Sequence, residues 1–350
     1  MGWQPGRRNL ISDVPGFAIG QVHDEALRSG VTVILPSEPA RGAADIRGGG
    51  PGTRETETMA DYGVVNQLHA LVLSGGSAFG LDAATGVQSF LREKGVGFEV
   101  GAARVPIVPQ AILFDLLNGG DKEWGLHSPY RDMAYEAAAK ASETFALGTA
   151  GAGFGATVAA LHSGNRIMGG IGSASLCRED GLVVGALAAV NAAGSVTVGD
   201  TPHFWAAPFE IGGEFGGLGS APALDPAAGP ILKSGPLQNT TLAVVATNAA
   251  LIKPELKRLA IMAQSGMSRA IVPVHTPLDG DIVFALSLGD FILENPPFGL
   301  AELGAQAAAT LSRAIARGVY EAGGIPGVSD VPAYRDLFPG AFSANRPAQH

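Results

Sequence analysis

The sequence predicts an α/β fold in which helices cover two stacked β-sheets. Short apolar runs bounded by Gly, Pro, Asn or Asp alternate with amphipathic helical patterns along the 350-residue chain. The runs have the spacing of short strands joined by turns rather than of regular strand–helix–strand units. The helical pattern at 133–146 is rich in alanine, and helices of small residues can approach a sheet closely. We therefore expect a layered sandwich with two sheets inside.

The predicted elements extend over most of the chain. Strands are expected at residues 31–35, 70–74, 181–190, 195–198, 242–247 and 282–286. Helices are expected at residues 81–94, 133–146, 254–270 and 305–322. Pro254 suits the first turn of the third helix, and Gly323 suits the end of the fourth. Residues 204–239 are crowded with glycine and proline and are expected to form a long loop. One structural domain accommodates all of these elements.

The composition excludes several classes of function. Hydrophobic residues make up 46% of the chain and charged residues 16%, which favours burial between layers or subunits and hence a homo-oligomer. The net charge is −9 and no basic cluster follows Arg7 and Arg8, so nucleic-acid binding is not expected. Asn191 and several glycines interrupt the apolar stretch at 181–198, so no membrane span is expected. A lone Cys177 and an N-terminus without a signal sequence indicate a cytoplasmic protein.

A candidate self-cleavage site lies where a hydroxyl pair precedes an apolar strand. Asn239, Thr240 and Thr241 are followed directly by the run at 242–247. If the Thr240 hydroxyl attacks the Asn239 carbonyl, the peptide becomes an ester, water completes the cut, and Thr240 begins a new chain. Its free α-amino group, with a pKa of about 7.7 to 8.0, is then a base for its own hydroxyl. The alternatives are a glycosylation sequon, which would require a secretory route, and an ordinary strand start.

Three polar residues elsewhere are candidates for the same chemistry. Asp279 and Asp281 flank Gly280 just before the run at 282–286, where they either form a hairpin turn or position an amine or hydroxyl. No further ligand follows at calcium-loop spacing, so a metal site is not expected. Asn191 lies between two apolar runs and is either part of a turn or a donor to the oxyanion of a tetrahedral intermediate.

The glycine-rich segments suggest other sites less strongly. Residues 48–54 lack the ending of a phosphate loop, and residues 151–156 follow no convincing strand, so both predict tight backbone packing. Residues 75–80 are similar to a nucleophile elbow, but Phe79 stands where the last glycine should be. Ser77 therefore remains only a rival nucleophile.

Taken together, these segments resemble the DmpA-type aminopeptidase and nylon-oligomer hydrolase family of self-processing N-terminal nucleophile hydrolases. The similarity runs in order through residues 9–16, 48–56, 73–81, 151–153, 169–175, 239–241 and 279–281. The resemblance implies a four-layer αββα sandwich, as in ornithine acetyltransferase, cut into an α chain of residues 1–239 and a β chain of residues 240–350. It implies hydrolysis of amide bonds in peptides or ω-amino-acid oligomers without a metal or organic cofactor, and we expect a homotetramer.

The resemblance also assigns roles residue by residue. Thr240 corresponds to the nucleophile, Asn239 to the residue left behind, Asn191 to the oxyanion donor, and Asp279 and Asp281 to carboxylates near the new amine. A substrate pocket is expected near Ser77, Phe79 and Arg166, with Phe79 standing where the nylon-oligomer branch has a tyrosine.

One departure from the family concerns a lysine. Relatives carry it near the position of Ala160 or Met168, where this chain has no lysine and Arg166 is the nearest cation in the segment. Because guanidinium does not release its proton, Arg166 could replace the charge but not a proton shuttle. Slower processing is therefore expected, and restoring a lysine at either position should accelerate it.

Two other functions remain open from the sequence. An acyltransferase of the ornithine acetyltransferase type would pass the acyl group to an amine rather than to water. An uncleaved inactive homologue would keep the fold without the chemistry. The choice among α-peptides, β-peptides and nylon-like oligomers as substrates also stays open, because pocket shape depends on distant loops.

Overall fold

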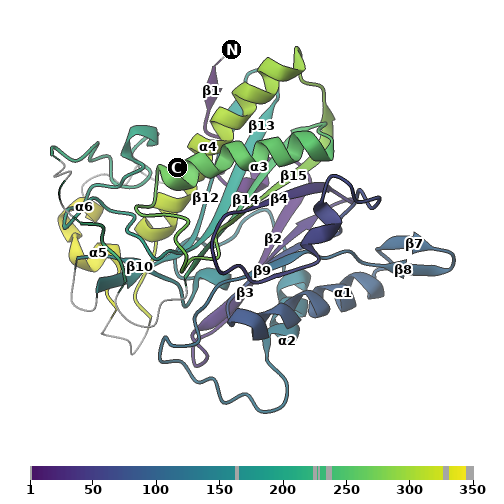
Figure 1. Cartoon of the computed structure of the whole chain (residues 1–350), viewed down its shortest axis with the longest axis horizontal. Helices are drawn as coiled ribbons and strands as arrows, with labels where there is room; N and C mark the ends of the chain where they lie inside the picture. The colour runs from purple at the N-terminus through teal and green to yellow at the C-terminus, as the bar shows by residue number, and fades with distance from the viewer. Residues whose placement is uncertain are drawn as a thin grey trace.

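The chain folds into four layers, with two β-sheets face to face and a pair of helices against each outer face (Figure 1). The computed structural model describes residues 2–161, 165–223, 227, 229–233, 239–325 and 331–343. The larger sheet has the strand order β1 (Trp3–Gln4), β12 (Gly170–Arg178), β13 (Val183–Asn191), β14 (Thr240–Ala249), β15 (Ile282–Phe291) and β4 (Arg41–Ile46). The second sheet has the order β2 (Phe17–Asp24), β3 (Ser29–Pro36), β6 (Leu71–Ser74), β9 (Gln110–Ile112) and β5 (Thr53–Arg54).

Apolar side chains fill the three spaces between the four layers. Helices α3 (Lys253–Ser268) and α4 (Pro296–Tyr320) cover the larger sheet, and α1 (Ala83–Glu93) and α2 (Tyr130–Ala139) cover the second. In the space between the two sheets, Ile34 and Leu71 of one sheet pack with Leu242 and Phe284 of the other. Smaller elements are the pairs β10 (Thr157–Ala159) with β11 (Arg166–Met168) and β7 (Phe98–Val100) with β8 (Ala103–Val105), and helices α5 (Tyr334–Leu337) and α6 (Pro339–Ser343).

Three strand ends meet at one edge of the larger sheet. β13 and β14 are antiparallel, so that Asn191, the last residue of β13, lies opposite Thr240, the first residue of β14. β14 and β15 are parallel, with Leu242 opposite Ile282. The segments that enter β14 and β15 therefore reach this edge together, beside the end of β13.

The predicted α/β sandwich with two sheets is confirmed, although several element boundaries were wrong. The helix expected at 133–146 begins at Tyr130 and ends at Ala139, and α4 begins at Pro296 rather than at residue 305. Residues 195–198 do not form a strand but make isolated bridges from Ser195 to Val272 and from Thr197 to Phe204. Strands β2, β4 and β12 were not predicted at all.

The described part of the glycine- and proline-rich loop is anchored to α4. Arg313 on α4 is fully buried, and its guanidinium donates to the Glu214 carboxylate at 2.5 and 3.0 Å. It also donates to Asn9 Oδ1 at 2.8 Å. This pair joins a segment before residue 240 to a helix after it, so the contact does not depend on the bond between Asn239 and Thr240.

Removing one partner from this buried pair should destabilise the protein strongly. Glu214→Ala leaves the Arg313 charge buried without its carboxylate, and we expect a loss of about 3 to 5 kcal/mol in the free energy of unfolding. Glu302→Ala, which breaks the half-exposed pair with Arg178, should cost less than about 1 kcal/mol. Denaturant unfolding of both variants checks this, and equal losses would contradict it.

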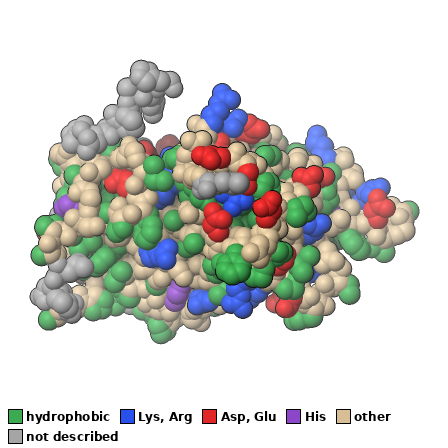
Figure 2. All heavy atoms as spheres, turned by 90° about the horizontal axis from the view of Figure 1, so that it is seen from above, with side chains coloured by type: hydrophobic (Ala, Val, Ile, Leu, Met, Phe, Trp, Pro, Cys, Tyr) green, Lys and Arg blue, Asp and Glu red, His purple; other side chains and the backbone are tan. Residues whose placement is uncertain are grey.

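The surface carries charges of both signs. Figure 2 shows Lys and Arg side chains lying among Asp, Glu and hydrophobic side chains on the face seen from above. None of the helices in the described ranges combines the length and the apolar character that a bilayer crossing requires.

Candidate active site

The peptide bond between Asn239 and Thr240 is held by hydrogen bonds at the edge where β13, β14 and β15 meet. The Asn239 N–H donates to the Leu278 carbonyl at 3.0 Å, and the Asn239 carbonyl accepts from the Gly280 N–H at 2.8 Å. The buried Thr240 hydroxyl also donates to the Asn239 carbonyl, at 2.5 Å. The hydroxyl is thus held against the carbonyl group of the bond that precedes it.

Gly280 is the residue that leaves room for this hydroxyl. A Cβ atom at position 280 would lie 2.6 Å from Thr240 Oγ1 and 2.8 Å from the Gly50 carbonyl oxygen. Real Cβ atoms do not approach other atoms so closely, so glycine is required here. The backbone of Gly280 both approaches the nucleophile candidate and donates to the carbonyl that it would attack.

Residues 48–50 pack tightly on the segment 279–281. The Gly50 N–H donates to the Asp279 carbonyl at 2.8 Å, and the Gly48 N–H donates to the Asp281 carbonyl at 3.2 Å. A Cβ atom at Gly48 would lie 2.2 Å from the Asp281 nitrogen. Close backbone packing is thus what this glycine run provides, as the sequence predicted.

Asp281 connects the start of β14 to the residues before β15. One carboxylate oxygen accepts from the Thr241 N–H at 2.8 Å. The other accepts from the His275 N–H and lies 3.0 Å from His275 Nδ1. Segment 279–281 does not form a hairpin, because β15 pairs in parallel with β14 and antiparallel with the distant β4.

Asp279 lies on the other side of Gly280 and is also buried. Its carboxylate accepts from the Ala193 N–H at 3.0 Å, the Thr276 N–H at 3.1 Å and the Thr276 hydroxyl at 2.6 Å. Burial, and then the charge of Asp281, raises the pKa of Asp279 despite these hydrogen bonds. The two carboxylates therefore have different surroundings on either side of the same glycine.

Asn191 lies directly opposite Thr240 with its side-chain amide held on both sides. Its carbonyl oxygen accepts from the Thr157 N–H at 3.0 Å, which fixes which end of the amide is the oxygen. Its nitrogen donates to the Phe114 carbonyl at 3.0 Å. An amide nitrogen carries two hydrogens, so one remains for a second acceptor. The residue ends a strand rather than forming a turn.

Lys233 is a member of the site that the sequence analysis missed. Its buried amine lies 3.2 Å from Asn191 Oδ1, and its backbone N–H donates to the Ala193 carbonyl at 3.1 Å. Burial lowers the pKa of Lys233, the charge of Asp279 opposes this, the charge of Arg166 adds to it, and the resulting pKa is about 7. The available signal was that Lys233 is the sole Lys or Arg in residues 204–239.

Lys233 supplies an amine that does not come from the segment where relatives carry their lysine. The segment around Ala160 and Met168 indeed holds no lysine, but an amine reaches Asn191 from the loop before Thr240. Ala160 and Met168 are themselves buried in apolar clusters. A lysine at either position would bury a second charge, so we no longer expect it to accelerate processing.

Ser77, Phe79 and Arg166 are the remaining predicted residues, and none of them lines the apolar pocket described below. The Ser77 N–H donates to the Leu113 carbonyl, next to Phe114. Within the described ranges the Ser77 hydroxyl has no hydrogen bond to a histidine or carboxylate. Phe79 is 56% exposed and meets Trp124 edge-on at 5.5 Å between ring centroids. Arg166 lies on β11 and acts on Lys233 through its charge.

Two buried polar atoms beside Thr240 have no hydrogen-bond partner among the residues that the structure describes. These are the amide nitrogen of Asn239 and the hydroxyl of Thr241. The two adjacent threonines therefore differ, since the Thr240 hydroxyl is bonded to the Asn239 carbonyl and the Thr241 hydroxyl is not. Over the same described ranges, no three His, Cys, Asp or Glu side chains converge as a metal site.

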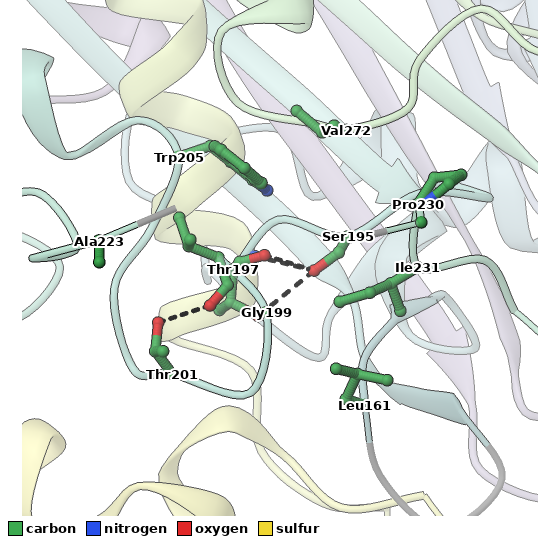
Figure 3. A pocket seen from close by; sticks show the side chains of 12 residues that line it. Leu161, Ser195, Thr197, Gly199, Thr201, Trp205, Ala223, Pro230, Ile231 and Val272 are labelled. Atoms are coloured by element: carbon green, nitrogen blue, oxygen red, sulfur yellow. Dashed lines mark hydrogen bonds between the residues drawn. The ribbon is translucent and has the colours of Figure 1, made fainter. Parts of the chain in front are cut away.

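A largely apolar pocket of about 290 Å³ lies near Lys233 and Ala193 in the chain. Figure 3 shows Ile231, Val272, Leu161 and Trp205 around it, and Ser195 donating to Thr197. Ile231 precedes Lys233 by two positions, and Ser195 follows Ala193 by two. Two of the lining residues therefore lie, along the chain, two positions from residues that contact Asn191 and Asp279.

Comparison with known proteins identifies the family of this chain. Residues 9–332 match peptidase family S58. The chain is 42% identical to an uncharacterized aminopeptidase of Mycobacterium tuberculosis, covering 96% of this chain and 100% of that protein. It is 29% identical to a 6-aminohexanoate-oligomer endohydrolase of Paenarthrobacter ureafaciens, covering 83% and 78%.

Solved structures share the fold at low sequence identity. A Burkholderia sp. beta-aminopeptidase matches with a TM-score of 0.70 at 21% identity, over 99% of this chain and 97% of that one. An L-aminopeptidase D-Ala-esterase/amidase of Ochrobactrum anthropi, described as a variant of the Ntn hydrolase fold, matches with a TM-score of 0.69 at 18% identity, over 97% and 96%. The chain belongs to peptidase family S58, and its activity is the hydrolysis of amide bonds.

Proposed function

We propose that this protein is a self-processing N-terminal threonine amidohydrolase that cuts itself between Asn239 and Thr240. The observation that carries the proposal is the Thr240 hydroxyl 2.5 Å from the Asn239 carbonyl oxygen, with the Gly280 N–H on that same oxygen. A nucleophile and an oxyanion donor therefore converge on one buried peptide bond. The cut would leave an α chain of residues 1–239 and a β chain of residues 240–350.

In the self-cleavage step, Thr240 Oγ1 bonds to the Asn239 carbonyl carbon. The carbonyl oxygen becomes an oxyanion that the Gly280 N–H already faces. When the intermediate collapses, the bond from carbon to the Thr240 nitrogen breaks, and the hydroxyl proton ends on that nitrogen. Water then hydrolyses the ester, leaving the Asn239 carboxylate and restoring the Thr240 hydroxyl.

In turnover, the freed Thr240 amine serves as the base for its own hydroxyl. With a pKa of about 7.7 to 8.0 in water, such an amine can accept the proton and return it to the leaving amine. The remaining Asn191 N–H would donate to the oxyanion of the tetrahedral intermediate, both when the chain cuts itself and when a substrate is attacked. Asp279 and Asp281 lie on either side of Gly280, whose N–H bonds to the Asn239 carbonyl, and would orient the new amine. The acyl-enzyme is then released by water.

Small peptides or ω-amino-acid oligomers are the proposed substrates. The names of the relatives, an aminopeptidase and an oligomer endohydrolase, support this class. The apolar pocket that Ile231 and Ser195 help to line would accept an apolar part of the substrate. Release of amine product from peptide and oligomer substrates, with and without an added amine, tests this. Transfer to the added amine in preference to water would favour an acyltransferase.

A charge at the mouth of the pocket should impair turnover selectively. Leu161 lines the pocket but is half-exposed, so Leu161→Asp should fold. Losing apolar contact with the substrate should lower kcat/KM for apolar substrates by roughly 10-fold. The rate of self-cleavage should not change, because Asn239 and Thr240 do not line this pocket. Equal kcat/KM in the wild type and in Leu161→Asp would show that the pocket does not bind the substrate.

The assembly proposed from the sequence is a homotetramer in the cytoplasm. Only 16% of the residues are charged, and Tyr62 and Val64 expose most of their side chains. Such exposed apolar groups favour burial between subunits. Light scattering coupled to gel filtration measures the assembly, and a monomer at micromolar concentration would contradict it.

A further inference from the structure

Lys233 is a buried cation in an unusual environment. It belongs to the loop before β14, yet its side chain reaches inward, and the hydrogen bond that the described residues show for its amine is the one to Asn191 Oδ1. Burying an ammonium group with only a neutral amide as its bonded partner is costly. A surface lysine would avoid that cost, so its inward position calls for a function.

We propose that Lys233 is a positioning residue for self-cleavage, which holds the Asn191 amide in place from the segment that precedes the cut. The inference rests on the proposed function, because it assigns one part of the reaction at Thr240. Lys233 bonds to Asn191, not to the reacting atoms, and Asn191 lies opposite Thr240 in the sheet.

Three contacts fix the Asn191 side chain, and Lys233 supplies the charged one. The Thr157 N–H and the Lys233 amine both donate to Oδ1, while Nδ2 donates to the Phe114 carbonyl. These contacts hold the amide plane and leave one N–H free of them. A cation on Oδ1 also draws electron density from the amide, which makes that N–H a stronger donor.

The lysine is anchored so that it remains in place after the cut. The Lys233 N–H donates to the Ala193 carbonyl, and the Ala193 N–H donates to Asp279. Lys233 and Ala193 both precede Asn239 in the chain, and Asp279 follows Thr240. Neither hydrogen bond therefore involves the peptide bond that breaks. The segment before the cut thus delivers an amine and keeps it beside Asn191 during turnover.

The charge of this amine depends on pH. Asp279 favours the protonated form, Arg166 opposes it, and burial lowers the pKa to about 7. The protonated amine is the better donor to Asn191, so the rate of self-cleavage should fall as pH rises through about 7. In the uncut chain the Thr240 nitrogen is part of a peptide bond and does not titrate. It therefore does not make the rate of self-cleavage rise over the same pH range.

The test is a time course of cutting for protein made by cell-free synthesis, followed by mass spectrometry between pH 5.5 and 9. Lys233→Met keeps the apolar stem and removes the charge, and we expect cutting to slow by roughly 10- to 100-fold. Lys233→Arg keeps the charge at every pH and should restore much of the rate while abolishing the decline above pH 7.

Lys253→Met is the matched control. Lys253 is another buried lysine, but its amine donates to the carbonyls of Thr58, Ala60 and Gly63 at 2.9 to 3.1 Å. Its loss should lower the melting temperature without changing the pH profile of cutting. If Lys233→Met lowers the melting temperature no more than this control and still cuts slowly, the effect is on the reaction.

Two results would overturn the proposal. One is cutting by Lys233→Met at the wild-type rate. The other is a rate of cutting that rises through pH 7 in the wild type, together with equally slow cutting by Lys233→Arg and Lys233→Met. That combination would mean that the lysine acts as a base. Thr240→Ala separates this inference from the proposed function: if that variant is still cut, the function proposed for Thr240 fails whatever Lys233 does.

Discussion

Thr240→Ala should give a single uncut chain with no measurable amide hydrolysis. The substitution removes the hydroxyl that lies 2.5 Å from the Asn239 carbonyl oxygen, and with it the nucleophile of both reactions. Removing a catalytic nucleophile costs on the order of 10⁴-fold or more in kcat. Thr240→Ser keeps a hydroxyl and should still cut. Gel analysis and a hydrolysis assay on the purified variants measure both effects.

The neighbouring threonine provides the control for this substitution. Thr241 is equally buried, but its hydroxyl has no partner among the described residues. Thr241→Val keeps the shape of the side chain and the backbone N–H that donates to the Asp281 carboxylate. We expect this variant to cut and hydrolyse as the wild type does, with stability unchanged or slightly raised. If Thr240→Ala is still cut, or if only Thr241→Val fails to cut, Thr240 is not the nucleophile.

Gly280→Ala should slow self-cleavage by about 100-fold or more. The new Cβ would lie 2.6 Å from Thr240 Oγ1, so the hydroxyl must leave its position against the Asn239 carbonyl. A misplacement of about 1 Å is enough for a loss of this size. The same Cβ would approach the Gly50 carbonyl oxygen to 2.8 Å, so a lower melting temperature is expected as well.

Gly50→Ala separates these two effects. A Cβ at position 50 would meet the Asp279 carbonyl oxygen at 3.8 Å, which is ordinary van der Waals contact. The variant alters the same pair of packed loops without approaching Thr240, and it should cut at the wild-type rate. If Gly280→Ala also cuts at that rate, the observed position of the Thr240 hydroxyl is not the one that reacts.

The elements that carry the nucleophile were predictable because local signals agree with the fold. The apolar run after Thr241 and the run after Asp281 became β14 and β15, and Asn191 ends β13. Strand β12 was missed because it is rich in Gly and Ala, which are depleted in strands. Its glycines are required by the layer above: a Cβ at Gly172 would lie 1.8 Å from the Ala314 carbonyl oxygen of α4.

Lys233 stands out in the sequence as the sole Lys or Arg of residues 204–239, but its contact with Asn191 was not predictable, because it depends on where a loop folds back. Nothing in the neighbouring residues indicates that this side chain turns inward to Asn191, a residue on a strand far earlier in the chain. The same is true of the Gly280 N–H, whose bond to the Asn239 carbonyl follows from the parallel pairing of β14 with β15. Sequence patterns identify strands and hydroxyls, whereas such contacts depend on the register between distant segments.

Intact mass spectrometry of the purified wild-type protein tests the central claim most directly. We expect two polypeptides whose masses correspond to residues 1–239 and 240–350, with one water added across the pair. We expect them to appear together with hydrolytic activity as the full-length chain disappears. A full-length chain that persists undivided while hydrolysing amides at its full rate would contradict the account.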